Sequence, residues 1–291
     1  MQKLSSALFA AAITLACAAA GAGGSAARWQ TLPLERPLPE LTAQGRIEHD
    51  GARIWYAVLG AGRPVVLLHG GLANSETWGN QVPALIDSHH RVILVDSRGH
   101  GRSTLGTQPL SYELMETDVI AVMDELRVDV ATIVGWSDGA IISLIMAMRH
   151  PARVSEVYAF GANMDATAVK PGTFSSPVLS ELAKRLANDY ARLSPTPDGF
   201  TTLHSAVETM QKSQPNYSAA DLAAIHGPRI AVADGDHEEF ITRAHTEYLA
   251  RTIPGATLII LHGVSHFAPW QAPGEFNRSM ISFLDQASRQ F

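Results

Sequence analysis

Residues 131–145 read ATIVGWSDGAIISLI, and this stretch decides the fold. An apolar run leads into Gly-Trp-Ser-Asp-Gly, and a second apolar run with helical character follows it. In this strand–turn–helix setting the G-x-S-x-G pattern projects the Ser137 hydroxyl from the carboxyl end of a sheet. So tight a turn leaves no room for flanking side chains, which explains Gly135 and Gly139. Ser137 is therefore the predicted nucleophile, and a helix-capping serine in a glycine-rich turn is the alternative.

Outward from this stretch, strands and helices alternate along the chain. Apolar runs such as residues 64–68 (PVVLL) and 91–95 (RVILV) are typical of strands buried on both faces. Their alternation with helices implies parallel pairing through right-handed crossovers. The other predicted strands are residues 53–59, 130–134, 154–160, 229–233 and 257–261, and the main predicted helices are residues 112–126, 140–149, 242–251 and 273–286.

Two segments depart from this alternation. Residues 163–227 contain no buried-strand pattern but have amphipathic stretches at 178–193 and 203–210, which predicts a helical insertion over the sheet. Residues 31–40 are rich in proline and predict an extended arm.

A serine hydroxyl needs a base, and a histidine just beyond the last predicted strand is best placed to act as one. His266 lies in the loop sequence GVSHF, whereas His262 ends the strand itself, so His266 is preferred. The two histidines are four residues apart, as in a zinc-binding helix. Gly263 and the preceding strand argue against a helix there, so no metal site is predicted.

The base needs an acid that fixes its tautomer, and the first three acidic residues of the segment 234–239 (DGDHEE) are the candidates for this role. Asp234 is interpreted as a turn former, which leaves Asp236 and Glu238. Backbone amides should supply the oxyanion hole. The amide of Asp138 directly follows the nucleophile, and that of Gly71 lies in the glycine-containing loop 69–72 (HGGL); a plain glycine-rich turn is the alternative for that loop.

Four aromatic residues lie in or near the motif segments and predict an apolar or aromatic substrate group, with core packing as the alternative. They are Trp78, Trp136, Phe267 and Trp270.

These segments together resemble the α/β-hydrolase superfamily. The matching pieces are residues 69–71, 96–103 (DSRGHGRS), the serine turn, the acid turn and residues 265–266, in the family's order. The resemblance implies an α/β fold with an eight-stranded, mostly parallel sheet, helices on both faces and a helical cap after the sixth strand. It also implies an acid three residues after Gly235, which selects Glu238 and makes Asp236 the second choice.

The serine turn is similar to that of valacyclovir-hydrolase-like enzymes, where an acid after the nucleophile is linked to a substrate ammonium. Asp138 stands at that position, although an aspartate is also simply tolerated at a helix N-terminus. The predicted division is residues 28–162 and 228–291 for the core and residues 163–227 for the cap.

The predicted activity is hydrolysis of a small carboxylic ester through an acyl-enzyme on Ser137, with no cofactor. Amidase or aminopeptidase, carbon–carbon bond hydrolase and perhydrolase chemistry use the same constellation of residues and remain alternatives. A ligand-binding protein that has kept a hydrolase fold is the alternative from another class.

Composition limits the partners. The chain of 291 residues is 46% hydrophobic and 17% charged with a net charge of −6, which is typical of a globular protein and does not favour nucleic-acid binding. Residues 1–27 combine Lys3, an alanine-rich apolar run and small residues, which predicts a signal peptide and export to the periplasm or medium. Lipid anchoring through Cys17 is a minor alternative, and no stable membrane span is predicted. Removal of this segment would leave no cysteine and no disulfide.

Overall fold

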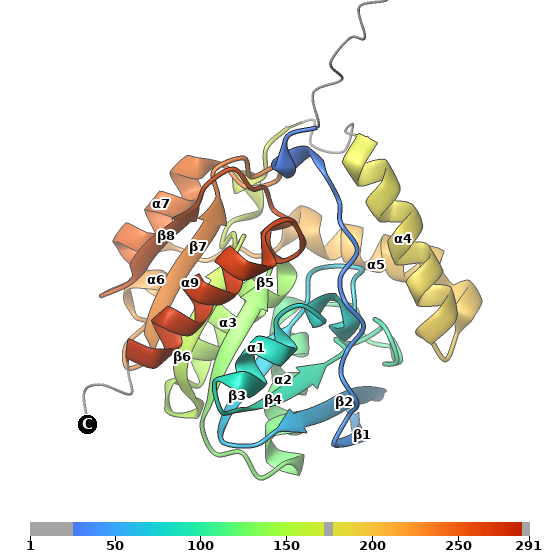
Figure 1. Cartoon of the computed structure of the whole chain (residues 1–291). Helices are drawn as coiled ribbons and strands as arrows, with labels where there is room; N and C mark the ends of the chain where they lie inside the picture. Colours follow the sequence, from blue (N-terminus) through green and yellow to red (C-terminus); the bar gives the residue numbers. More distant parts are fainter. Residues whose placement is uncertain (1–25, 172–176, 287–291) are drawn as a thin grey trace, which may run out of the picture.

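The computed structural model describes residues 26–171 and 177–286. The predicted signal peptide, apart from its last two residues, and Cys17 lie outside the described residues. Eight strands form one sheet in the order β1-β2-β4-β3-β5-β6-β7-β8, in which β2 runs antiparallel to both of its neighbours and every other pair is parallel (Figure 1). Their bounds are β1 (Ala43–His49), β2 (Ala52–Gly60), β3 (Arg63–Leu68), β4 (His90–Val95), β5 (Ala131–Trp136), β6 (Val154–Phe160), β7 (Arg229–Gly235) and β8 (Thr257–Leu261).

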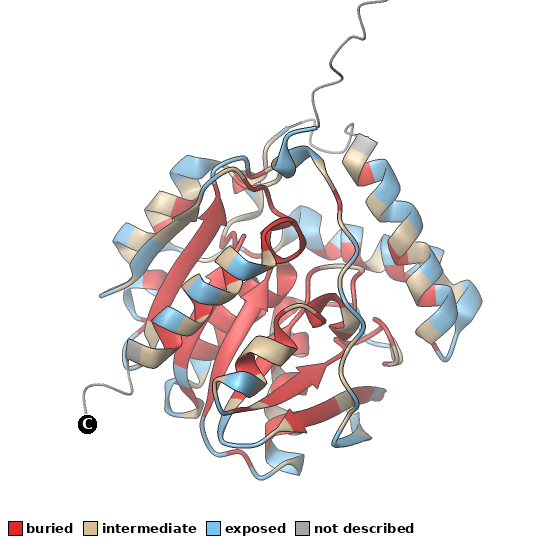
Figure 2. Ribbon diagram, in the orientation of Figure 1, coloured by how far each residue is buried: buried red, intermediate tan, exposed pale blue. Residues whose placement is uncertain are grey.

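Helices cover both faces of this sheet. Neighbouring residues of one strand point to opposite faces, so Val66 and Leu68 enter one hydrophobic cluster while Val65 and Leu67 enter the other. The first cluster includes residues of α2 (Tyr112–Glu125), α3 (Asp138–Arg149) and α7 (Arg243–Thr252), and the second includes residues of α1 (Val82–Asp87), α8 (Ala268–Gln271) and α9 (Pro273–Gln286). The inner strands are buried between these layers, whereas the edge strands β1 and β8 and the outer faces of α7 and α9 are exposed (Figure 2).

The segment between β6 and β7 carries α4 (Pro177–Leu193), α5 (Phe200–Ser213) and α6 (Ala219–Ala223). In Figure 1, α4 stands beside the body of the sheet with α5 behind it. No helix within the described ranges is both long and apolar enough to cross a membrane.

The predicted arm has no regular secondary structure over residues 31–41 and runs between α4 and the core (Figure 1). Arg185 of α4 donates hydrogen bonds to the carbonyls of Leu32 (2.8 Å) and Pro33 (3.1 Å). Leu32 is buried in the same hydrophobic cluster as Leu186 of α4. The arm therefore joins α4 to the body of the protein.

The seven predicted strands are confirmed with bounds shifted by two residues or fewer, and so is the mostly parallel sheet. The sequence-based prediction missed β1, which pairs with β2 at the edge of the sheet from Ala43↔Val58 to His49↔Ala52. It also missed the short helices α1, α6 and α8.

Candidate active site

Ser137 occupies a sharp turn between β5 and α3. Its backbone has φ 57° and ψ −122°, a strained conformation for a residue with a side chain. A Cβ on Gly135 would overlap the carbonyl of Gly139, and a Cβ on Gly139 would overlap the carbonyl of Leu68. Gly135 is therefore required by the close approach of the start of α3, and Gly139 by the packing of the turn against β3.

His266 and Glu238 form a buried pair. His266, in the loop after β8, and Glu238, in the loop after β7, are 3% and 7% exposed. Nδ1 of His266 lies 2.8 Å from Oε2 of Glu238. The other carboxylate oxygen accepts backbone N–H groups from Phe240 (2.6 Å) and Ile241 (3.1 Å). This arrangement favours the tautomer with a proton on Nδ1, which leaves the lone pair of Nε2 free to accept a proton.

Burial sets the protonation of this pair. Loss of solvent lowers the pKa of His266, although the nearby carboxylates of Glu239 and Asp138 oppose this shift. Burial also raises the pKa of Glu238 to about 7, opposed by hydrogen bonds from Asp234 and from backbone amides. The imidazole is therefore held neutral near pH 7, as a general base requires.

Close contacts place the His266 loop beside the turn that carries Ser137. The amide of Ser137 donates to the carbonyl of Phe160 (2.9 Å), and Trp136 Nε1 donates to the carbonyl of His266 (2.8 Å). A Cβ on Gly161 would lie 2.6 Å from Cε1 of the His266 ring. Neither Ser137 Oγ nor His266 Nε2 has a hydrogen-bond partner among the described residues, so both remain available to a substrate.

The loop at residues 69–72 lies against the nucleophile. A Cβ on Gly70 would be 3.0 Å from Cβ of Ser137, and one on Gly71 would be 2.6 Å from Oδ2 of Asp138. The amide of Asp138 is the first of α3, where a helix leaves N–H groups without an internal acceptor. The two predicted oxyanion amides thus belong to segments that adjoin Ser137.

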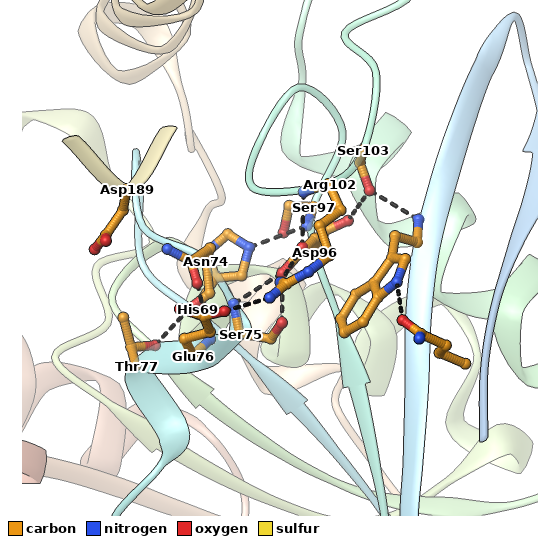
Figure 3. A network of polar contacts seen from close by, with 12 residues as sticks. His69, Asn74, Ser75, Glu76, Thr77, Asp96, Ser97, Arg102, Ser103 and Asp189 are labelled. Carbon is orange, nitrogen blue, oxygen red and sulfur yellow. Dashed lines mark hydrogen bonds and ion pairs between the residues drawn. The ribbon is translucent and has the colours of Figure 1, made fainter. Parts of the chain in front are cut away.

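A network of polar contacts anchors this loop (Figure 3). His69 Nε2 accepts the amide of Ser97 (3.0 Å). Buried Asp96 accepts hydrogen bonds from the amide (2.8 Å) and hydroxyl (2.5 Å) of Ser75 and from the amide of Arg102 (2.8 Å). Because Asp96 and Ser97 directly follow β4, the network ties the loop after β3 to the neighbouring strand.

The side chain of Asp138 has two partners that sequence reasoning missed. Tyr112 donates its hydroxyl to Oδ1 (2.9 Å), and Gln211 of α5 donates its amide to both oxygens (3.0 and 3.1 Å). Burial raises the pKa of Asp138, while these two hydrogen bonds oppose the shift. The partners lie 26 and 73 residues away in sequence, and no local pattern marks them.

Asp236, the second choice for the acid, does not contact His266. Its carboxylate accepts the amides of Gly263 (2.7 Å) and Val264 (3.4 Å) and lies 3.3 Å from Nδ1 of His262. It therefore holds the start of the loop that carries His266. Asp234, interpreted from sequence as a turn former, lies instead within β7, where its side chain is buried.

The four predicted substrate-binding aromatic residues are 1–4% exposed and belong to one core cluster. Trp136 packs edge-on against Phe267 and Trp270, with ring centroids 6.2 and 5.0 Å apart. Trp270 Nε1 donates to the carbonyl of Thr77 (3.1 Å). The rings pack around the turn and the His266 loop, and their contact with substrate stays a prediction.

Residues 63–226 match the family model described as alpha/beta hydrolase fold. The chain belongs to this family. It is 29% identical over 252 residues to a candidate carbamate hydrolase, RutD of Caulobacter sp. (strain K31), covering 76% of this chain and 91% of that protein. It is also 23% identical over 251 residues to serine hydrolase BPHL of Mus musculus, covering 82% and 85% of the two chains.

Solved structures of this family superpose on the chain. One is that of Est816, described as an N-acyl homoserine lactone degrading enzyme, with 26% identity, a TM-score of 0.65 and coverage of 82% of this chain and 100% of that one. The family match and these likenesses show that the chain is an alpha/beta hydrolase with hydrolytic activity.

Proposed function

We propose that this alpha/beta hydrolase is a serine hydrolase that cleaves a small carboxylic ester through an acyl-enzyme on Ser137. The observation that carries the proposal is the buried His266–Glu238 pair, joined by a 2.8 Å hydrogen bond, beside the strained turn of Ser137. A nucleophile, a base and an acid that orients the base are the three groups that acyl transfer by serine requires.

In the proposed reaction, Ser137 Oγ attacks the ester carbonyl while His266 Nε2 takes the hydroxyl proton. The amides of Gly71 and Asp138 stabilise the oxyanion, each by roughly 3 kcal/mol. The imidazolium returns the proton to the departing alcohol, which leaves an acyl group on Oγ. His266 then takes a proton from water as the water attacks the acyl carbonyl, and collapse of the second oxyanion releases the carboxylic acid and restores Ser137.

A small substrate is supported by the cap. Gln211 of α5 reaches Asp138 beside the nucleophile, so the insertion limits the space over the site. RutD and Est816 are named for carbamates and lactones, which fits attack on a carbonyl carbon that carries a heteroatom leaving group. Amide, carbon–carbon and perhydrolase chemistry remain the alternatives on the same residues.

Aminoacyl esters are the second candidate substrate class. The observation that favours them is the Asp138 carboxylate, which lies beside Gly71 and could pair with a substrate ammonium. Tyr112 and Gln211 already donate to this carboxylate, so an ammonium would have to join or displace them.

The test is hydrolysis of a panel of p-nitrophenyl esters and aminoacyl esters by wild type and Ser137→Ala. Wild type should hydrolyse at least one class, and the variant should lose activity by about 10³-fold or more. A fluorophosphonate probe should label wild type and not the variant. A variant as active as wild type would refute the mechanism, and a folded wild type that takes no label would favour the ligand-binding alternative.

Export is proposed as well. Arg28, the first residue after the predicted signal peptide, donates to the carbonyls of His262 (2.7 Å) and Gly263 (3.1 Å) and pairs with Glu275 (2.8 Å). A mature chain that keeps Arg28 would keep these contacts to the His266 loop. Amino-terminal sequencing of the protein from the periplasm or medium tests this, and recovery of the intact amino terminus in the cytoplasm would contradict it.

A further inference from the structure

Asp234 carries a buried carboxyl that the proposed reaction does not use. It pairs in register with Ile260 of β8 and is 1% exposed. Its side chain lies within hydrogen-bonding reach of the side chain of Glu238. A hydrogen bond between two carboxyl groups requires a proton on one of them, because two carboxylates have only acceptors.

The other hydrogen bonds decide which group carries that proton. Glu238 accepts three N–H donors: Phe240 N (2.6 Å), Ile241 N (3.1 Å) and His266 Nδ1 (2.8 Å). Asp234 accepts the hydroxyl of Thr246 (2.7 Å) and the amide of Gly235 (2.9 Å). The negative charge is therefore better stabilised on Glu238, and the proton belongs on Asp234.

The surrounding charges act in the same direction. Burial raises the pKa of Asp234 well above its ordinary range, and the charge of Glu238 adds to the shift. Glu239 also faces this cluster, since its Oε2 accepts the amide of His266 (2.8 Å). The carboxylate of Asp138 also raises the pKa of the His266 ring. Two cations face Glu238: the Lys170 ammonium donates to its backbone carbonyl (2.6 Å), and the His266 imidazolium, when it forms, lies against its carboxylate.

We infer that Asp234 is a positioning residue: its neutral carboxylic acid donates a hydrogen bond to Glu238, and so keeps Glu238 ionised and directed at His266. This inference rests on the proposed function, because Glu238 matters to the reaction only as the acid that orients His266. It gives the site two buried acids of different charge, one neutral donor and one anionic acceptor.

Two substitutions test this role. Asp234→Asn keeps the shape and an N–H donor, so kcat and its pH profile should stay within about threefold of wild type. Asp234→Ala removes the donor. The ionised form of Glu238 then loses a stabilising contact and its pKa rises, so the acidic limb of the kcat profile should move to higher pH. At neutral pH kcat should fall by about tenfold or more while KM changes little.

An Asn variant as impaired as the Ala variant would overturn the inference, and so would an Ala variant with the wild-type profile. Infrared spectroscopy of protein carrying ¹³C-labelled aspartate gives a readout that needs neither catalysis nor Asp234→Ala to fold. The C=O stretch of a protonated acid at pH 7 should be present in wild type and reduced in Asp234→Asn. If that band is identical in the two proteins, Asp234 is ionised and the inference fails. If instead Ser137→Ala keeps full activity, the proposed function fails, and the infrared result still reports the protonation of Asp234.

Discussion

Replacement of Glu238 by Gln should lower kcat by about 10³- to 10⁴-fold with little change in KM. The structure explains the size of this effect. Oε1 of Glu238 accepts two backbone amides, at 2.6 Å from Phe240 and 3.1 Å from Ile241, so the carbonyl oxygen of a glutamine would occupy that position. Its NH₂ group would then face Nδ1 of His266, 2.8 Å from the present oxygen. Two donors cannot face each other, so the imidazole would move its proton to Nε2 and could no longer accept the proton of Ser137.

The assay is steady-state hydrolysis of whichever ester wild type prefers, with circular dichroism to show that the variants are folded. The matched control is Asp236→Asn, because Asp236 lies in the same turn but binds the amides of Gly263 and Val264 instead of His266. The control should keep kcat within about threefold of wild type. The reasoning is refuted if Glu238→Gln retains more than about a tenth of the wild-type kcat, or if Asp236→Asn is the more damaging change.

Three further changes test two buried acidic residues of the fold and one glycine of the oxyanion hole. Burial raises the pKa of Glu116 from 4.5 to about 7, so ionisation of Glu116 destabilises the folded state as the pH rises through that range. Glu116→Gln should therefore raise the free energy of unfolding at pH 8 by up to about 3 kcal/mol and have little effect at pH 4. Urea denaturation at the two pH values measures both. Asp118 and Arg98 form a buried ion pair with contacts of 2.6 and 2.9 Å, so Asp118→Asn should lower stability by about 3–5 kcal/mol in the same assay, and a loss below about 1 kcal/mol would contradict this reasoning. Gly71→Val should cost more activation free energy, measured from kcat, than free energy of unfolding, because its side chain would meet the carboxylate of Asp138 and displace an oxyanion amide. Kinetics and thermal denaturation on one sample measure the two losses, and a larger loss of stability than of activity would contradict this reasoning.

Strands buried on both faces could be predicted because their whole sequence is apolar. Every residue of 65–68 and 92–95 is buried in the structure, and both segments read as continuous runs of Val, Ile and Leu. The edge strand β1 (AQGRIEH) has no such run, and its residues alternate between exposed and half-exposed from Gln44 to His49. Its pairing with β2 depends on backbone hydrogen bonds, which leave little trace in the sequence.

The site was predictable where local geometry restricts the residue type. The turn around Ser137 demands glycine at two positions, so the pattern is visible in the sequence. The acid was ambiguous because Asp236 and Glu238 are two residues apart in one turn, and only their contacts to the distant loop at 262–266 separate them. Proximity to the motifs predicts substrate contact for the aromatic residues, but the sequence does not report that Trp136 and Trp270 are at most 4% exposed.

The core of the site and its cap are held by different kinds of contact, which predicts how rate and specificity divide between them. Loops that carry the reacting groups are fixed by buried carboxylates with several donors, such as Asp96 and Glu238. On the cap side, Gln211 forms hydrogen bonds to Asp138 in the turn that carries Ser137. Because a neutral amide is easily exchanged for a substrate group, a change at Gln211 should alter KM differently from one ester to another. Changes at the buried carboxylates should instead lower kcat for all substrates alike.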